Sequence, residues 1–135
     1  MAYQFATSTV NAALDALETE IGAGAIMRLY TLAPPANVAA AETGVLLAEL
    51  ALPADWLLAA ANRVKAKSGT WQDLAANAAG VAAHFTVYAA DGVTRKIQGT
   101  VSLTGGGGDM QLDNTNIGVG QVVTCTGFNI NGPVA

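Results

Sequence analysis

The sequence predicts a mainly β protein, a single-domain antiparallel β-sandwich of jelly-roll-like form with one N-terminal α-helix. Short segments rich in Val, Ile, Thr and aromatic residues recur along the chain, and Gly, Pro, Asn and Asp separate them. Asp91-Gly92 lies between two such segments and favours a hairpin, because both residues tolerate positive φ. Only the beginning of the chain shows apolar residues at helical spacing. One domain is usual for 135 residues, so we expect a helical segment, 1–24, packed on or extending from a β-sandwich, 25–135.

The helix is expected at about residues 8–21. One apolar stripe repeats there at helical spacing, formed by Val10, Leu14, Leu17 and Ile21. Thr7 or Ser8 could cap the N-terminus by accepting a backbone N–H bond. Gly22 can supply the left-handed residue that ends the helix.

The first strands follow the helix directly. Residues 25–32 and 45–52 are rich in β-forming side chains, and a proline soon after each segment ends the strand. Glu49 is expected on the outward face of the second strand. Residues 36–43 between the two strands are predicted to form a loop.

The middle of the chain leaves two alternatives open. Residues 54–61 have helical propensity, but alanine-rich runs also occur in strands, and propensity is a weak guide. We favour a loop or a short helical turn that leads into a strand at about 61–67. A further turn is expected at 71–76.

Four further segments are predicted as strands, at 80–89, 95–103, 109–113 and 121–130. The third alternates cleanly, so Met110 and Leu112 should point inward. Gly105 to Gly108 is expected to form a flexible turn before it.

Charge is scarce throughout the chain. Charged residues make up 12% of the sequence, against about 25% in ordinary proteins, and none occurs from Asn114 to Ala135. A free monomer of this kind exposes much neutral surface, whereas an assembly subunit hides it. The net charge of −4, with only 6 Lys and Arg residues, argues against a nucleic-acid partner held by phosphate contacts.

Targeting signals are also lacking. The start of the chain has no basic segment followed by an apolar stretch, so no signal peptide is expected. No window of about 20 apolar residues could span a membrane. We therefore expect synthesis in a cytoplasm and no membrane partner.

The usual catalytic and metal-binding patterns do not occur. The run Gly105–Gly108 lacks the Lys-Ser/Thr pair of a phosphate-binding loop. Asp109 and Asp113 share one strand face about 13 Å apart, too far for paired-carboxylate catalysis, which needs roughly 5–9.5 Å. We therefore expect solvated edge charges here, and no catalytic, cofactor-binding or metal site.

Two single residues are predicted to be structural. His84 is the only histidine, and its apolar neighbours favour a structural or interface role, with alternation placing it on the outer face of a strand. Cys125 is the only cysteine, so no intrachain disulfide forms, and a buried core thiol is expected. Zinc would need more Cys and His than the chain has. The protein is therefore not expected to be an enzyme.

A basic stripe marks the middle of the chain. Arg63, Lys65 and Lys67 alternate, which puts all three on one face of a strand. A solvated strand face is the simplest interpretation, and contact with an acidic protein partner is the alternative.

The order of segments resembles that of small structural proteins encoded among the virion genes of tailed bacteriophages and prophages, some of which resemble capsid decoration (cement) proteins. The resemblance covers most of the chain. After the helix it is carried by Ile26–Thr31, Gly44–Leu50, His84–Tyr88, Ile97–Val101, Leu112–Thr115, Gly120-Gln121 and a final Thr- and Val-rich strand.

This resemblance implies a decoration protein that binds the major capsid protein on the outer capsid surface and stabilises the head. It implies no cofactor, a homo-oligomer (dimer or trimer), and localisation in the virion after synthesis in the bacterial host. The alternatives are a tail- or fibre-associated subunit, a small carbohydrate-binding module, or a small hydrolase that would depend on His84.

Bulky residues at 55–58 and 71–74 depart from this family pattern and could form a partner-specific contact. The tail 131–135 could lie against a neighbouring subunit. The candidate interface residues are therefore Trp56, Leu57, Arg63, Lys65, Lys67, Trp71 and Val134.

Overall fold

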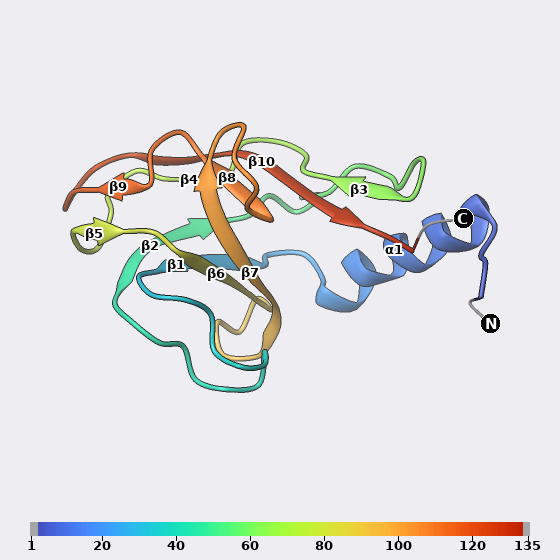
Figure 1. Cartoon of the computed structure of the whole chain (residues 1–135), viewed down its shortest axis with the longest axis horizontal. Coiled ribbons are helices and arrows are strands. Elements are labelled where there is room, and N and C mark those ends of the chain that lie inside the picture. Colours follow the sequence, from blue (N-terminus) through green and yellow to red (C-terminus); the bar gives the residue numbers. More distant parts are fainter. Residues whose placement is uncertain (1–2, 134–135) are drawn as a thin grey trace.

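The computed structural model describes residues 3–133 and shows a mainly β protein with one N-terminal helix (Figure 1), which confirms the predicted fold class. The elements follow one another as α1 (Thr7–Ile21), β1 (Ile26–Tyr30), β2 (Leu46–Ala51), β3 (Val64–Ala66), β4 (Gln72–Asp73), β5 (Gly80–Val81), β6 (His84–Tyr88), β7 (Arg95–Leu103), β8 (Met110–Leu112), β9 (Asn116–Ile117) and β10 (Val123–Asn131).

Most of the strands belong to one curled sheet. Its order is β2-β1-β6-β7-β8-β10-β3, with β4 also paired to β10, while β5 and β9 form a separate pair. Among the described residues every strand pair is antiparallel except β7 and β8, which are parallel. The sheet curls until β4 meets β2, where the Asp73 carboxylate accepts the Glu49 N–H at 2.9 Å. The two halves therefore face each other in a sandwich-like arrangement.

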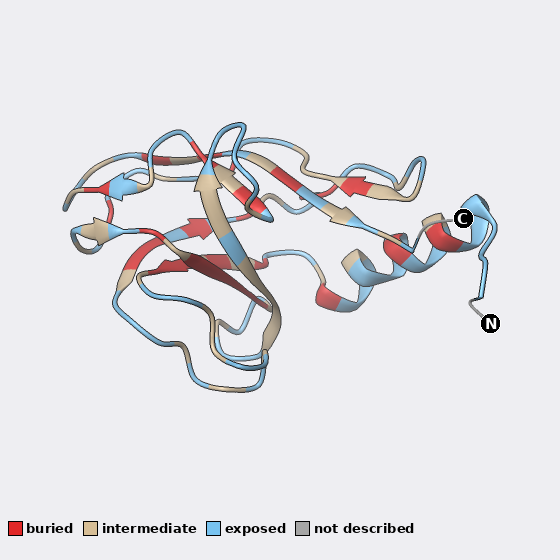
Figure 2. Ribbon diagram, in the orientation of Figure 1, coloured by how far each residue is buried: buried red, intermediate tan, exposed pale blue. Residues whose placement is uncertain are grey.

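The core between the two halves holds a chain of aromatic rings. Trp56 and Trp71 have ring centroids 5.8 Å apart, Trp71 and Phe128 5.2 Å, and Phe85 and Phe128 5.6 Å. All four side chains are buried and belong to one core cluster with side chains of β1, β2 and β6, whose buried segments are red in Figure 2. Full burial of each large apolar side chain contributes about 1.5–3 kcal/mol, so this cluster holds the two halves together.

The helix forms where its periodicity predicts it, but its N-terminal cap differs. Ala6 occupies the cap position in an extended conformation and makes no side-chain cap bond, so the predicted capping by Thr7 or Ser8 is wrong. The helix ends at Gly22, whose φ is +87° and whose N–H bonds to the Glu18 carbonyl. Val10, Leu14 and Ile21 are buried, whereas Leu17 stays exposed.

The segment 54–61 is neither a helix nor a strand. It is irregular, with isolated bridges from Leu57 to Lys67 and from Ala61 to Val64, so the predicted loop is confirmed. The Asp91-Gly92 hairpin is confirmed too, since β6 and β7 pair on either side of it and Gly92 has φ +70°.

The parallel pairing of β7 and β8 depends on a tight return loop. Parallel strands normally need a connection of a dozen or more residues, but here residues 104–109 fold back along β7. A Cβ at Gly106 would lie 2.6 Å from Ser102 Oγ, and one at Gly108 would lie 2.6 Å from Ser102 N. Glycine is therefore required sterically at these two positions of the predicted turn.

Candidate functional site

Lys65, the middle residue of the basic stripe, attaches the helix to the sheet. Lys65 is only 3% exposed, and its Nζ lies 2.7 Å from Asp15 Oδ1 and 2.9 Å from Glu18 Oε2. Three helix side chains also accept backbone N–H groups of the facing segment: Asn11 from Arg63 at 3.0 Å, Asp15 from Ala60 at 2.8 Å, and Glu18 from Leu57 at 3.2 Å. Positions 11, 15 and 18 share one helix face. We call this contact, between residues 11–18 of α1 and residues 57–65, the helix seam.

The helix seam keeps its charges at neutral pH. Burial disfavours the ammonium of Lys65, but the hydrogen bonds to Asp15 and Glu18 outweigh it and raise the pKa of Lys65. The hydrogen bond from Lys65, helped by the Ala60 N–H, lowers the pKa of Asp15. The seam is therefore an ion-paired joint between helix and sheet.

This arrangement corrects four of the candidate interface residues. Lys65 faces the helix instead of solvent, so a solvated strand face is wrong for it. Trp56, Leu57 and Trp71 are at most 1% exposed and belong to the core. Both indole N–H groups are satisfied internally, by the carbonyls of Gly22 and Ser68. Their predicted contact with a partner is wrong, because an irregular segment has no periodicity that reveals which way its side chains face.

The other candidates lie nearer the surface. Arg63 donates to the Pro133 carbonyl at 2.9 Å and to the Phe5 carbonyl, so it joins both ends of the described chain. Lys67 donates to the Gly69 carbonyl and lies 5.7 Å from the Trp71 ring centroid. Val134 lies outside the described residues.

A second polar cluster lies under the loop that connects β1 to β2. Figure 1 shows this loop, blue to cyan, on the side of β6 away from β10. The cluster joins the loop to β1, β6 and β7, and we call it the loop cluster. It consists of Tyr30, Glu42, His84, Tyr88 and Arg95.

The loop cluster converges on one carboxylate. Glu42 accepts two hydrogen bonds from Arg95, at 2.6 and 3.0 Å, and a third from the Tyr88 hydroxyl. The bond from Arg95, followed by the one from Tyr88, lowers the pKa of Glu42 to about 2. Burial and then the contact with Glu42 raise the pKa of Tyr88. The Tyr88 and Tyr30 hydroxyls lie 2.9 Å apart.

His84 is covered by this loop. It stacks on Tyr30 with ring centroids 5.1 Å apart, and its Nδ1 lies 2.8 Å from the Leu32 carbonyl. Within residues 3–133, His84 Nε2 and Thr86 Oγ1 are buried without a hydrogen-bond partner. His84 does lie on the sheet face opposite Phe85, but alternation alone could not show that a loop buries it.

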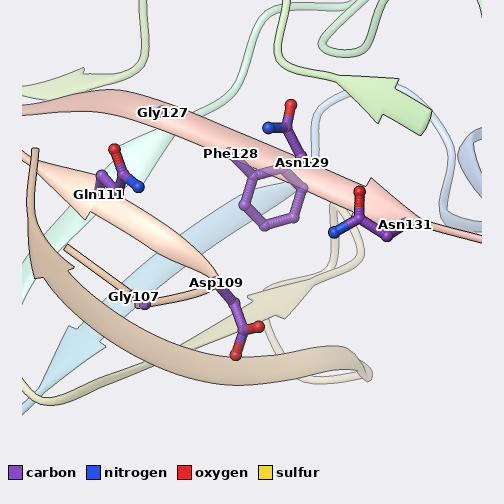
Figure 3. A pocket seen from close by; sticks show the side chains of 8 residues that line it. Gly107, Asp109, Gln111, Gly127, Phe128, Asn129 and Asn131 are labelled. Carbon is purple, nitrogen blue, oxygen red and sulfur yellow. The ribbon is translucent and has the colours of Figure 1, made fainter. Parts of the chain in front are cut away.

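A groove opens where β7 and β10 diverge. Two adjoining hollows of about 200 and 280 Å³ share Asp109, Phe128, Asn129 and Asn131. Figure 3 shows Asp109 at the start of β8 and the Phe128 ring between the strands, with Asn129 and Asn131 following along β10. We call this feature the open groove.

The remaining groups offer little for metal or thiol chemistry. No set of three or more His, Cys, Asp or Glu side chains among residues 3–133 is placed to hold a metal ion. Burial raises the pKa of Cys125 to about 11, as expected for a core thiol. No helix in the described part of the chain has the length and apolarity to cross a membrane.

Comparisons of the chain with protein-family models, with curated proteins and with solved structures found no match.

Proposed function

We propose that the chain is a structural protein of a tailed-phage virion, and specifically a capsid decoration protein. It binds the major capsid protein on the outer capsid surface as a homo-oligomer, a dimer or a trimer. The observation that carries this proposal is the number of large apolar side chains exposed on a surface with few charges. The resemblance of the segment order to that of phage virion proteins indicates which assembly the protein would join, the capsid.

Part of the exposed apolar surface lies at the end of the molecule opposite α1. β4 pairs with β10 through Val123 and Asp73, so the next residues, Val122 and Leu74, lie opposite each other. The β5–β9 pair and the turn that follows it occupy the same end in Figure 1. The exposed side chains there, called the apolar end below, are Leu74, Val81, Val119 and Val122.

The apolar end has the composition of a surface that a stable protein–protein interface buries. Contiguous exposed apolar patches mark interaction sites, and the centres of protein interfaces are depleted in charge. None of the residues from Asn114 onward is charged. Few charged side chains would therefore lose their hydration when a partner covers the apolar end. A carbohydrate-binding module would instead present aromatic rings on a sheet face, and both tryptophans are in the core.

The test is co-sedimentation with capsids of the phage that encodes the protein. Wild-type protein should bind expanded capsids and reach saturation at hundreds of copies. Val119→Asp, which puts a charge in the apolar end, should lose binding. Val93→Asp is the matched control, because Val93 is 72% and Val119 73% exposed but Val93 lies at the β6–β7 hairpin.

Failure of the wild-type protein to bind expanded capsids would remove the decoration role. Mass spectrometry of purified virions then separates the alternatives. Hundreds of copies indicate the capsid, whereas a handful indicates a tail- or fibre-associated subunit.

A further inference from the structure

The open groove exists because one strand is too short for its place in the sheet. β8 has 3 residues, while its neighbours β7 and β10 have 9 each. β8 covers β7 only at residues 101–103 and covers β10 only as far as Phe128. Beyond that point no strand of the described chain lies between the rest of β7 and Asn129–Asn131 of β10.

The hydrogen-bond pattern indicates which backbone groups of the two facing edges point toward the groove. On β10, the Phe128 carbonyl and the Gly132 N–H bond to the β3 side. Alternation therefore directs the backbone groups of Asn129 and Asn131 to the opposite side, where the Asn129 N–H faces Asp109 at the start of β8 and the groups of Asn131 face the open groove.

The same alternation determines which backbone groups of β7 face the groove. The Val101 N–H bonds to Ala83 on the β6 side, whereas the Thr100 N–H turns the other way, to the Asp109 carboxylate at 3.0 Å. Alternation then points the backbone N–H and C=O of Gln98 toward the groove, and a bulge at Lys96 ends the regular pattern. Each wall thus offers at least one backbone N–H and C=O pair, that of Asn131 on β10 and that of Gln98 on β7.

The lining of the groove fits an extended chain without charges. The hollow beside β7 has several apolar side chains in its lining, whereas the hollow beside the return loop is lined mainly by glycines and polar residues. Both hollows include one carboxylate, that of Asp109, which already accepts the Thr100 N–H and hydroxyl at 3.0 Å. The apolar lining residues are Phe85, Ile97, Phe128 and Ile130, and the side-chain amides belong to Asn129 and Asn131, since the Gln98 amide donates to the Pro35 carbonyl of the β1–β2 loop at 2.9 Å.

We propose that the open groove accepts residues Tyr3–Ala6 of a second copy of the chain as an added strand. This segment is uncharged, forms no helix or strand in its own copy, and exposes Tyr3 by 87% and Phe5 by 44%. In an extended segment Tyr3 and Phe5 point to the same side, so both rings can face the apolar lining residues. Strand addition at an open edge is an established mode of peptide binding.

The donor is a second copy because the segment is directed away from the groove of its own copy. Arg63 holds the Phe5 carbonyl beside Pro133, and Figure 1 shows residues 3–6 leading away from the sheet beyond the start of α1. The inference concerns contact between copies and does not require a capsid, so it can fail while the proposed function stands.

A mixed disulfide experiment tests the contact directly. Two variants, Gln4→Cys and Asn131→Cys, are purified separately, mixed and mildly oxidised. If the segment of one copy enters the groove of the other, the cross-linked heterodimer should form at least about tenfold more than with Val93→Cys, since docking raises the local thiol concentration. Cys125 is buried in every variant and does not compete.

Equal heterodimer yields with Asn131→Cys and Val93→Cys would overturn the proposal. A double variant carrying both Gln4→Cys and Asn131→Cys provides the check on the donor. A disulfide that forms only within one chain would place the segment in the groove of its own copy, which also contradicts exchange.

A backbone substitution supplies an independent readout. Gln4→Pro removes an N–H that an added strand donates to one of the two walls, while Gln4→Ala keeps it. Light scattering after size exclusion should show a loss of multimers for Gln4→Pro and wild-type assembly for Gln4→Ala. Unchanged assembly of Gln4→Pro, or a wild-type protein that is monomeric at all concentrations, would refute strand exchange.

Discussion

The helix seam and the loop cluster both attach a peripheral segment to the sheet, but they distribute their contacts differently. The helix seam has several anchor points, and after loss of Lys65 its acids Asp15 and Glu18 would still accept backbone N–H groups. In the loop cluster the charged bonds from β6 and β7 all converge on Glu42, and the other bonds to the loop, such as that between His84 and the Leu32 carbonyl, are made by neutral acceptors. The helix thus spreads its charged contacts over several residues, whereas the loop concentrates its charged contacts on one residue.

The largest effect should therefore come from Glu42→Ala. It leaves Arg95 and the Tyr88 hydroxyl without their acceptor, and hydrogen bonds to charged groups contribute about 1.5–3 kcal/mol each. We expect a loss of about 3 kcal/mol in the free energy of unfolding, measured by urea denaturation, and faster hydrogen exchange in the loop and β6.

Thr43→Ala is the matched control for this variant. Its hydroxyl bonds to the Ala33 carbonyl within the same loop, so its removal should cost no more than about 1 kcal/mol. If the two variants are equally stable, attachment of the loop does not converge on Glu42.

Acid should weaken the loop cluster in a defined range. The pKa of Glu42 is lowered from 4.5 to about 2 in the folded state. The stability that depends on its charge is therefore complete above pH 4.5 and declines as the pH falls toward 2.

Melting curves of wild type and Glu42→Gln between pH 6 and 2 measure this effect. The difference in melting temperature between wild type and Glu42→Gln should shrink across that range as the wild-type carboxylate becomes protonated. A difference in melting temperature that stays constant with pH would show that the charge of Glu42 does not stabilise the fold.

A smaller effect is expected from Lys65→Met. The methionine fills the same buried space, and the two carboxylates left behind keep their backbone N–H donors, while Asp15 also reaches solvent. This limits the cost of removing one partner of an ion pair. We expect a loss of about 1 kcal/mol, with the helix retained by circular dichroism. A loss as large as that of Glu42→Ala would mean that the helix seam also depends on one residue.

The smallest effect should be a gain from Ala6→Ser. Ala6 already has the extended conformation of a cap residue but lacks a side-chain acceptor. A serine there should stabilise the helix by roughly 0.5–1 kcal/mol, read as a rise in melting temperature. The control Ala13→Ser adds the same hydroxyl within the helix and should give no gain.

The sequence predicts the elements whose signals are local. The helix follows from apolar spacing and Gly22, the hairpin from Asp91-Gly92, and the inward side chains of β8 from strict alternation at Met110 and Leu112. Each of these signals lies within a few residues and reports a backbone conformation that those residues favour.

The sites depend instead on contacts between distant segments. Alternation correctly placed His84 on the face opposite Phe85, but it is wrong in placing Lys65 on one strand face with Arg63, because Arg63 precedes β3 with a φ of +65°. Nothing near Lys65 or His84 shows that a helix covers the first and a loop the second. No local sequence pattern marked Glu42 as a functional residue, because its partners Tyr88 and Arg95 are 46 and 53 residues away along the chain. The open groove arises from the unequal lengths of β7, β8 and β10, which no single segment reveals.

The return loop gives the protein a convenient place for a spectroscopic probe. A Cβ at Gly107 meets no atom within 4 Å, and the position does not need a left-handed backbone, unlike Gly105. The only native thiol, that of Cys125, is buried, and its pKa of about 11 leaves it unreactive toward maleimides near neutral pH. A single fluorophore on Gly107→Cys would therefore be attached selectively at the rim of the groove, where its emission would report occupancy in real time.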